Sequence, residues 1–178
     1  MRLVILIGAS GSGKTAIAEA IAVEYPGLVE VLHFDRIGVP SSEEMTAGWG
    51  SGEAWQRAMT LNWLAKIAAM RDQDRPVLFE GQTRLASVRE GLLAANISDA
   101  RVILVDCDDE TRTRRLTENR CQPDLASPEM MNWAAFLRRD AQESGCDVLD
   151  TSHLSLADGV EYVRAQLLDA IPKPSVEI

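Results

Sequence analysis

Short runs of apolar, often β-branched residues recur five times along the chain. Runs of this length and composition are typical of strands that lie buried inside a protein. The predicted strands are Leu3 to Ile7, Val29 to Phe34, Pro76 to Phe79, Arg101 to Asp106 and Asp147 to Leu149. We expect them to pair into one sheet.

Segments with helical signals lie between these runs. In the longest, Glu53 to Arg71, apolar residues recur at the spacing of one helix face. The acids Asp108 to Glu110 are placed to stabilise the positive end of a helix that continues through Arg115. Three serines have the sequence context of helix N-caps: Ser87 before Glu90, Ser127 before Pro128 and Ser155 before Asp158.

The alternation of strands and helices predicts the fold class. It favours an α/β protein with three layers, in which helices cover both faces of a five-stranded parallel sheet. In such sheets ligands bind beyond the carboxyl ends of the strands. Polar residues that directly follow a predicted strand are therefore the first candidates for a functional site.

The segment Gly8 to Thr15 directly follows the first predicted strand. It matches the phosphate-binding loop pattern of glycine, four residues, glycine, lysine, and serine or threonine. Glycines let the backbone turn its N–H groups toward phosphate oxygens, Lys14 adds a cation for the β and γ phosphates, and Thr15 offers a hydroxyl to Mg²⁺. The predicted nucleotide contacts in this segment are Gly8, Ser10, Gly11, Ser12, Gly13, Lys14 and Thr15.

A flexible glycine-rich turn is the alternative interpretation of this segment. Given typical residue frequencies, the four fixed positions would arise by chance in a chain of this length about one time in a hundred. The segment also follows a β-branched strand and opens an amphipathic stretch that includes Ile17 and Ile21. This context favours phosphate binding.

Composition narrows the possible partners. The 178 residues suffice for one domain with a sizeable core, and no run approaches the roughly 20 apolar residues of a membrane-spanning helix. The three cysteines lack the spacing of a zinc site or a disulfide framework, which favours the cytoplasm. A net charge of −9 disfavours nucleic acid, although a local basic groove is compatible with a short strand. We expect a small-molecule partner and no membrane.

Two acids end predicted strands and so lie at the ligand edge. Asp35 ends the second strand, where it could take a proton from an attacking hydroxyl or hold Mg²⁺ through water. Glu80 ends the third strand, where it could bind Mg²⁺ or act as the general base. The structural alternatives are a turn-forming aspartate and a surface salt bridge between Glu80 and Arg84. His33 is expected to be a strand residue whose hydrogen bond is satisfied.

An arginine cluster follows the fourth predicted strand, at Arg112, Arg114, Arg115 and Arg120. On a regular helix Arg115 and Arg120 would lie about 140° apart, so they converge only if the helix ends or bends. Converging arginines could close over transferring phosphates. The alternative is a solvated helix face that pairs with nearby acids.

These motifs, in this order, resemble the small P-loop kinases related to adenylate, shikimate and gluconate kinases, over roughly the whole length to Ala170. The segment Gly8 to Thr15 is similar to their phosphate loop. Asp35 falls where shikimate- and gluconate-type kinases place the acid that meets the acceptor hydroxyl. The segment Glu80-Gly81-Gln82-Thr83-Arg84 looks like the nucleoside monophosphate kinase segment Asp-Gly-Phe-Pro-Arg, whose acid serves magnesium and whose arginine serves the acceptor's phosphate.

The resemblance also implies a lid and a base site. Arg115 through Arg120 looks like the start of the family's mobile lid, and Arg138-Arg139 looks like its return arginines. Asp150 to Ser155 resembles the loop whose backbone wraps adenine, which places Ser152 at the nucleotide. The implied organisation is a P-loop NTPase fold in one domain, 1–171, with a small helical lid at about 112–140 and a loose tail at 172–178.

Departures from the family patterns concern the substrate. The family's lid arginines sit four residues apart, whereas Arg115 and Arg120 are five apart and Asn119 occupies the expected position. The glycine triplet of shikimate kinases after the third strand is absent, as is a second acid two residues after Asp35. Glu80 stands where monophosphate kinases have aspartate. The resemblance therefore names a group of kinases and no single member.

The leading hypothesis is transfer of the γ-phosphate from ATP, with Mg²⁺, to a small hydroxyl- or phosphate-bearing metabolite, by a monomer or homodimer. The catalytic candidates are Lys14, Asp35, Arg115 and Arg120; the metal candidates are Thr15 and Glu80; the acceptor-binding candidates are Asp35, Arg36, Glu80 and Arg84. The lysine and lid arginines would neutralise charge on the phosphates, and Asp35 would orient or deprotonate the acceptor. The alternatives are a nucleotide-binding regulatory module or slow NTPase and, disfavoured by the acidic charge, a kinase of polynucleotide 5′ ends.

Overall fold

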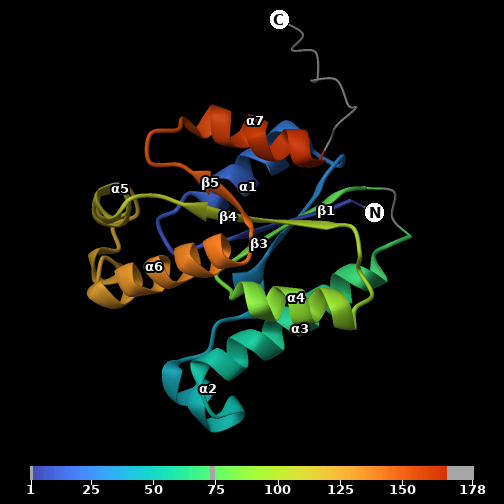
Figure 1. Ribbon diagram of the computed structural model, residues 1–178, viewed down its shortest axis with the longest axis horizontal. Helices are drawn as coiled ribbons and strands as arrows, with labels where there is room; N and C mark the ends of the chain where they lie inside the picture. The colour runs from blue at the N-terminus through green and yellow to red at the C-terminus, as the bar shows by residue number, and fades with distance from the viewer. Residues whose placement is uncertain (1, 73–74, 168–178) are drawn as a thin grey trace, which may run out of the picture.

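The computed structural model describes residues 2–72 and 75–167, and it contains one five-stranded sheet whose strand pairs are all parallel (Figure 1). The strand order is β2-β3-β1-β4-β5. The strands are β1 (Leu3–Ile7), β2 (Glu30–His33), β3 (Val77–Gly81), β4 (Ala100–Asp106) and β5 (Asp147–Asp150). All five predicted strands are confirmed, with small shifts of their ends. The predicted tail at 172–178 lies outside the described residues.

Helices cover both faces of the sheet, as predicted (Figure 1). One face is covered by α1 (Lys14–Glu24) and α7 (Leu156–Leu167), and the other by α3 (Gly52–Ala69), α4 (Leu85–Ala94) and α6 (Pro128–Glu143). The shorter elements are η1 (Phe34–Ile37), α2 (Ser42–Trp49), α5 (Asp109–Arg114), η2 (Arg115–Asn119) and η3 (Pro123–Leu125). Within the described ranges no helix is both long and apolar enough to cross a membrane.

The central strand β1 supplies apolar side chains to both layers of the core. Val4 and Leu6 pack with residues of α1 and α7, while Leu3, Ile5 and Ile7 pack with residues of α3, α4 and α6. Every residue of β1 is buried. A strand buried on both faces reads as a continuous apolar run, which is why this strand was readily predicted.

Two of the three predicted helix caps are confirmed and one is wrong. The side chain of Ser127 accepts from the Met130 backbone at the start of α6, and that of Ser155 accepts from the Asp158 backbone before α7. Ser87 lies inside the first turn of α4, which already begins at Leu85. The physical reason is packing: Leu85 is buried in the core, and the helix begins there, two residues before Ser87.

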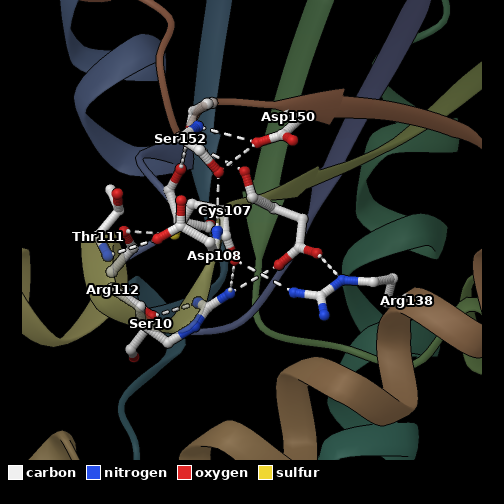
Figure 2. A network of polar contacts seen from close by, with 12 residues as sticks. Ser10, Cys107, Asp108, Thr111, Arg112, Arg138, Asp150 and Ser152 are labelled. Atoms are coloured by element: carbon white, nitrogen blue, oxygen red, sulfur yellow. Dashed lines mark hydrogen bonds and ion pairs between the residues drawn. The ribbon is translucent and has the colours of Figure 1, made fainter.

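A buried carboxylate at the end of β4 joins four parts of the fold. Oδ1 of Asp106 lies 2.6 Å from Nη2 of Arg112, and Oδ2 lies 2.6 Å from Nε of Arg138 in α6. Figure 2 labels the two arginines, which approach this carboxylate from different elements. Arg112 is fully buried, and its Nη1 also donates to the Ser10 carbonyl at 2.7 Å. Asp106 thus ties β4 to the segment after β1, to α5 and to α6.

This arrangement makes the stability of the fold sensitive to Asp106. Replacing Asp106 with Ala leaves the buried Arg112 guanidinium without its counter-charge, so we expect the free energy of unfolding to fall by about 3–5 kcal/mol. Denaturation in urea, followed by circular dichroism, measures the change. The matched control is Asp147→Ala, which removes an exposed aspartate 2.9 Å from Arg101 and should cost less than about 1 kcal/mol. Equal losses of unfolding free energy in the two variants would contradict the view that Asp106 joins these parts of the fold.

Candidate functional site

The segment Gly8 to Thr15 forms a loop between the end of β1 and the start of α1. A Cβ atom at Gly8 would collide with the Val105 carbonyl oxygen of β4, so no larger residue fits there. Gly13 has a φ of +98° and directly precedes the first residue of α1. The loop thereby delivers the N-terminus of α1, with its partial positive charge, to the carboxyl edge of the sheet.

The backbone carbonyl groups of residues 10 to 12 all accept hydrogen bonds from side chains of other parts of the fold. Arg112 donates to the first at 2.7 Å, Arg115 to the second and third at 3.3 Å each, and the Thr151 hydroxyl to the third at 2.8 Å. Because these carbonyls are bound by side chains, the N–H groups of the loop can point into its concave side. Such an arrangement of N–H groups suits the binding of phosphate.

Lys14 and Thr15 meet Glu80 beside this loop. Lys14 Nζ lies 3.9 Å from Oε2 of Glu80, and the Thr15 hydroxyl donates to the same oxygen at 3.3 Å. Burial lowers the pKa of Lys14, and the negative charges of Glu80 and Asp35 oppose that shift. The other oxygen of Glu80 is 2.7 Å from Nδ1 of His33. The structure therefore brings this strand-end acid to the phosphate loop, and it makes His33 a contact of Glu80.

Asp35 and Arg36 lie on η1, which continues from the end of β2. Both are exposed, and within the part of the chain that the structure describes neither side chain has a hydrogen bond or ion pair. Asp35 is close enough to Lys14 to raise the pKa of that ammonium. Of the two predicted acids, Glu80 is thus buried and bound, while Asp35 faces solvent near the same lysine.

Arg84 is held beside two aromatic rings. Its guanidinium lies 5.1 Å from the ring centroid of Trp133 and 4.7 Å from that of Phe136, and it donates to Glu53 at 3.1 Å. Such stacking favours a planar guanidinium and fixes its orientation. Sequence reasoning did not find these partners, although the three-residue spacing of Trp133 and Phe136 places both on one face of α6.

The helix that carries the arginine cluster changes pitch at Arg115. The segment η2 is a π turn, in which the Arg120 N–H donates to the Arg115 carbonyl at 3.1 Å, a bond that spans five residues. Regular α-helical geometry, in which Arg115 and Arg120 would lie far apart around the axis, therefore ends at Arg115. One π turn stacks residues five apart, so the unusual spacing still brings Arg115 and Arg120 to the same cavity. Arg115 is tied to the loop carbonyls, whereas Arg120 is exposed and has no hydrogen bond or ion pair within the described chain.

A cavity of about 500 Å³ lies between the phosphate loop, η2 and the segment that follows β5. Its size suits a nucleotide. Its lining includes apolar residues, which suit the faces of a base. The lining comprises residues 11 and 13–17, Glu19, Arg115, Asn119, Arg120, Thr151, Leu154, Ser155, Leu156 and Gly159. Sequence reasoning missed the members on α1 beyond Thr15 and on α7. The apolar ones carry no signal that separates a cavity wall from the core, and Glu19 has the pattern of an ordinary exposed helix residue.

Ser152 is not among the cavity-lining residues. Its hydroxyl accepts from the Asp108 N–H at 2.8 Å and donates to Asp150 at 2.6 Å (Figure 2). Hydrogen bonds from Ser152 lower the pKa of Asp150, and the Thr111 N–H lowers that of Asp108 at the start of α5. Ser152 thus shapes the loop after β5 by fixing it to the first turn of α5.

Thr15 and Glu80 offer the kind of donors that magnesium prefers. A hydroxyl and a carboxylate oxygen lie 3.3 Å apart at the end of the phosphate loop. Among the described residues no group of three or more His, Cys, Asp or Glu side chains could hold a metal ion. Mg²⁺ commonly takes one or two protein oxygens and completes its shell with phosphate oxygens and water. The residues present fit that mode of binding.

Comparison with known sequences gives one relative. No protein-family model matches the chain. A nucleotide-binding protein of Rhodospirillum rubrum is 29% identical over 189 residues, which cover 98% of this chain and 51% of that protein. The chain therefore spans about half the length of the curated relative it matches.

Solved structures that resemble the chain include several kinases. A sugar kinase from Janibacter sp. HTCC2649 has a TM-score of 0.71 at 18% identity, over 97% of this chain and 96% of that one. A shikimate kinase from Acinetobacter baumannii, in complex with shikimate, has a TM-score of 0.63 at 18% identity, over 95% and 94%. A gluconokinase from Sinorhizobium meliloti 1021 has a TM-score of 0.59 at 18% identity, over 94% and 92%. The chain has the fold of the small P-loop kinases, as its motifs predicted.

Proposed function

We propose that this chain transfers the γ-phosphate of ATP to a small hydroxyl- or phosphate-bearing metabolite. One observation carries the proposal: two acids at neighbouring strand ends beside the phosphate loop differ in state. Glu80 is buried and bound by Lys14 and Thr15, while Asp35 is exposed and near the same lysine. A kinase needs one acid on the metal side and one at the acceptor, and a loop that only binds nucleotide does not need the second.

The phosphate loop and the cavity beside it would hold the nucleotide. Gly8 to Thr15 would bind the phosphates through backbone N–H groups and the α1 N-terminus. The base would lie in the cavity against Leu154 and Leu156, whose loop is held to α5 by Ser152. Thr15 and Glu80 would hold Mg²⁺, which when bound neutralises charge on the β and γ phosphate oxygens.

Three cations of the chain would stabilise charge on the transferring phosphate. Lys14 lies at the loop, and Arg115 is fixed to the loop carbonyls at its rim. Arg120 lies one π turn further on the same cavity and is free to reorient. Lys14 and Arg115 are held in place before the reaction, so they cost no reorganisation during it and their effect on rate exceeds that of mobile ions in water.

At the acceptor, Asp35 would orient the attacking hydroxyl and take its proton. The bond that forms joins the acceptor oxygen to the γ phosphorus, and the bond that breaks leaves ADP. Arg36 and Arg84 would bind a phosphate on the acceptor, since arginine pairs well with phosphate. The aromatic rings around Arg84 hold it ready for that role.

A second candidate is a nucleotide-binding module that passes its nucleotide state to another part of a longer protein. The relative from Rhodospirillum rubrum favours it, because that protein is named for nucleotide binding and this chain matches about half of it. Such a module would use the phosphate loop and cavity, but it would not need Asp35 or Arg84.

Acceptor-stimulated ATP consumption separates the two candidates. In a screen with Mg²⁺ and panels of nucleosides, nucleotides, sugars and sugar acids, we expect one class of acceptor to stimulate release of ADP. Asp35→Asn should reduce the stimulated rate about 100-fold or more and leave ATP affinity unchanged, because it removes only the proton acceptor. Lys14→Ala should reduce both the rate and ATP affinity. ATP binding without stimulation by any acceptor would support the module instead.

The role of Arg84 predicts a preference for anionic acceptors. Arg84→Met should raise the KM of a phosphate-bearing acceptor about tenfold to hundredfold, because one charge-assisted hydrogen bond is lost. The KM of the same acceptor without its phosphate should not change. Arg57→Met is the matched control, since Arg57 also pairs with a glutamate, Glu90, across helices, but lies outside the site. A loss that is the same for both acceptors would argue against phosphate binding by Arg84.

A further inference from the structure

His33 and Glu80 face one another at the edge of the sheet where the phosphate loop lies. The two residues are partners in the register of β2 and β3. Nδ1 of His33 is 2.7 Å from Oε1 of Glu80, and the two side chains are only 12% and 7% exposed. A carboxylate can only accept hydrogen bonds, so the ring nitrogen is the donor when Glu80 is ionised.

The partners of Glu80 differ in how a nucleotide would affect them. Lys14 and Thr15 both approach Oε2, at 3.9 and 3.3 Å. In the proposed function Lys14 directs its charge to phosphate, and the Thr15 hydroxyl serves magnesium. His33 binds the other oxygen, Oε1, whereas the contacts of Lys14 and Thr15 are with Oε2. It is thus the contact that can hold the carboxylate throughout binding.

The backbone that presents His33 is itself held in place. The next residue, Phe34, is buried, and its carbonyl accepts from the Trp63 indole at 3.1 Å. The Phe34 ring packs edge to face on Trp55, with centroids 5.7 Å apart. Gly81, which follows Glu80, has no side chain to displace Phe34 from this position. The backbone next to His33 is therefore held in place, and it presents the imidazole to the Glu80 carboxylate from one position.

We propose that His33 is a positioning residue, whose hydrogen bond holds the Glu80 carboxylate with Oε2 turned toward the Thr15 hydroxyl. The Thr15 hydroxyl oxygen and Oε2 of Glu80 are then already close together when the magnesium–nucleotide complex binds. The inference rests on one part of the proposed function, namely that the nucleotide binds together with Mg²⁺ at Thr15 and Glu80. Loss of a partner behind a metal ligand typically lowers metal affinity or activity about 10–100-fold.

The test compares the affinity of the whole chain for ATP in excess Mg²⁺ and in EDTA, by titration calorimetry. The ratio of the two affinities reports the metal-dependent part of binding. We expect His33→Leu, which has no donor, to lower this ratio about tenfold or more while the affinity in EDTA stays unchanged. His33→Asn keeps an amide donor near the position of Nδ1 and should retain most of the ratio.

Two further variants separate the positioning of Glu80 by His33 from general damage to the fold. Thr60→Val removes a buried hydrogen bond, 2.7 Å to Thr83, without touching Glu80, and it should leave the ratio unchanged. In a Glu80→Gln background, adding His33→Leu should lower the ratio no further, because the two residues act as one unit.

Several outcomes would overturn the inference. These are an unchanged ratio in His33→Leu, equal losses with Mg²⁺ and with EDTA, a His33→Asn chain as impaired as His33→Leu, and a wild-type chain whose ATP affinity does not depend on Mg²⁺. None of these measurements uses an acceptor. A chain that binds Mg²⁺ and ATP as expected but phosphorylates no acceptor would therefore refute the kinase proposal and leave the role of His33 standing.

Discussion

A backbone loop that turns its N–H groups toward an anion must find other partners for its carbonyl groups. In this chain the carbonyls of residues 10 to 12 find them in Arg112, Arg115 and Thr151. A buried guanidinium cannot stand without a counter-charge, so Arg112 requires Asp106. The hydrogen bonds to the loop carbonyls and the ion pair of Arg112 with Asp106 therefore connect the loop to the end of β4, to the residue after β5 and to the helix that bears the arginines.

This requirement separates two members of the arginine cluster from Arg114 and Arg120, which are exposed. Arg112 and Arg115 hold the loop from behind and beside it, and their guanidinium groups are occupied by backbone oxygens. Arg120 has no such partner within the described chain and lies one π turn further on. A single run of sequence thus supplies both the support of the loop and an exposed arginine at the cavity beside it. The π turn reconciles the five-residue spacing with convergence on one cavity.

The opposite side of the loop is organised by side chains at the ends of β2 and β3. Glu80 contacts Lys14, Thr15 and His33, which makes it a buried, bound acid beside the loop Gly8 to Thr15. Asp35, two residues beyond His33, lies on an exposed turn. Parallel strands of nearly equal length bring both acids to one edge, and their different burial assigns them different chemistry in the proposed reaction.

The order of the elements and the phosphate loop could be predicted from sequence because their signals are local. Apolar periodicity reports burial, and a glycine pattern reports a backbone shape, whatever the rest of the chain does. Helix α2 was not predicted: none of its residues is buried, so apolar periodicity is lacking, and the capping box of Ser41 and Glu44 is the local signal at its start. The start of α4 was misplaced, because α4 begins at the buried Leu85, two residues before the serine that had the sequence context of a cap. The contacts of His33 with Glu80, of Arg112 with Asp106 and of Arg84 with two rings join residues from different elements. Only the tertiary structure decides such contacts, because strand register, helix pitch and burial set which polar groups must satisfy one another.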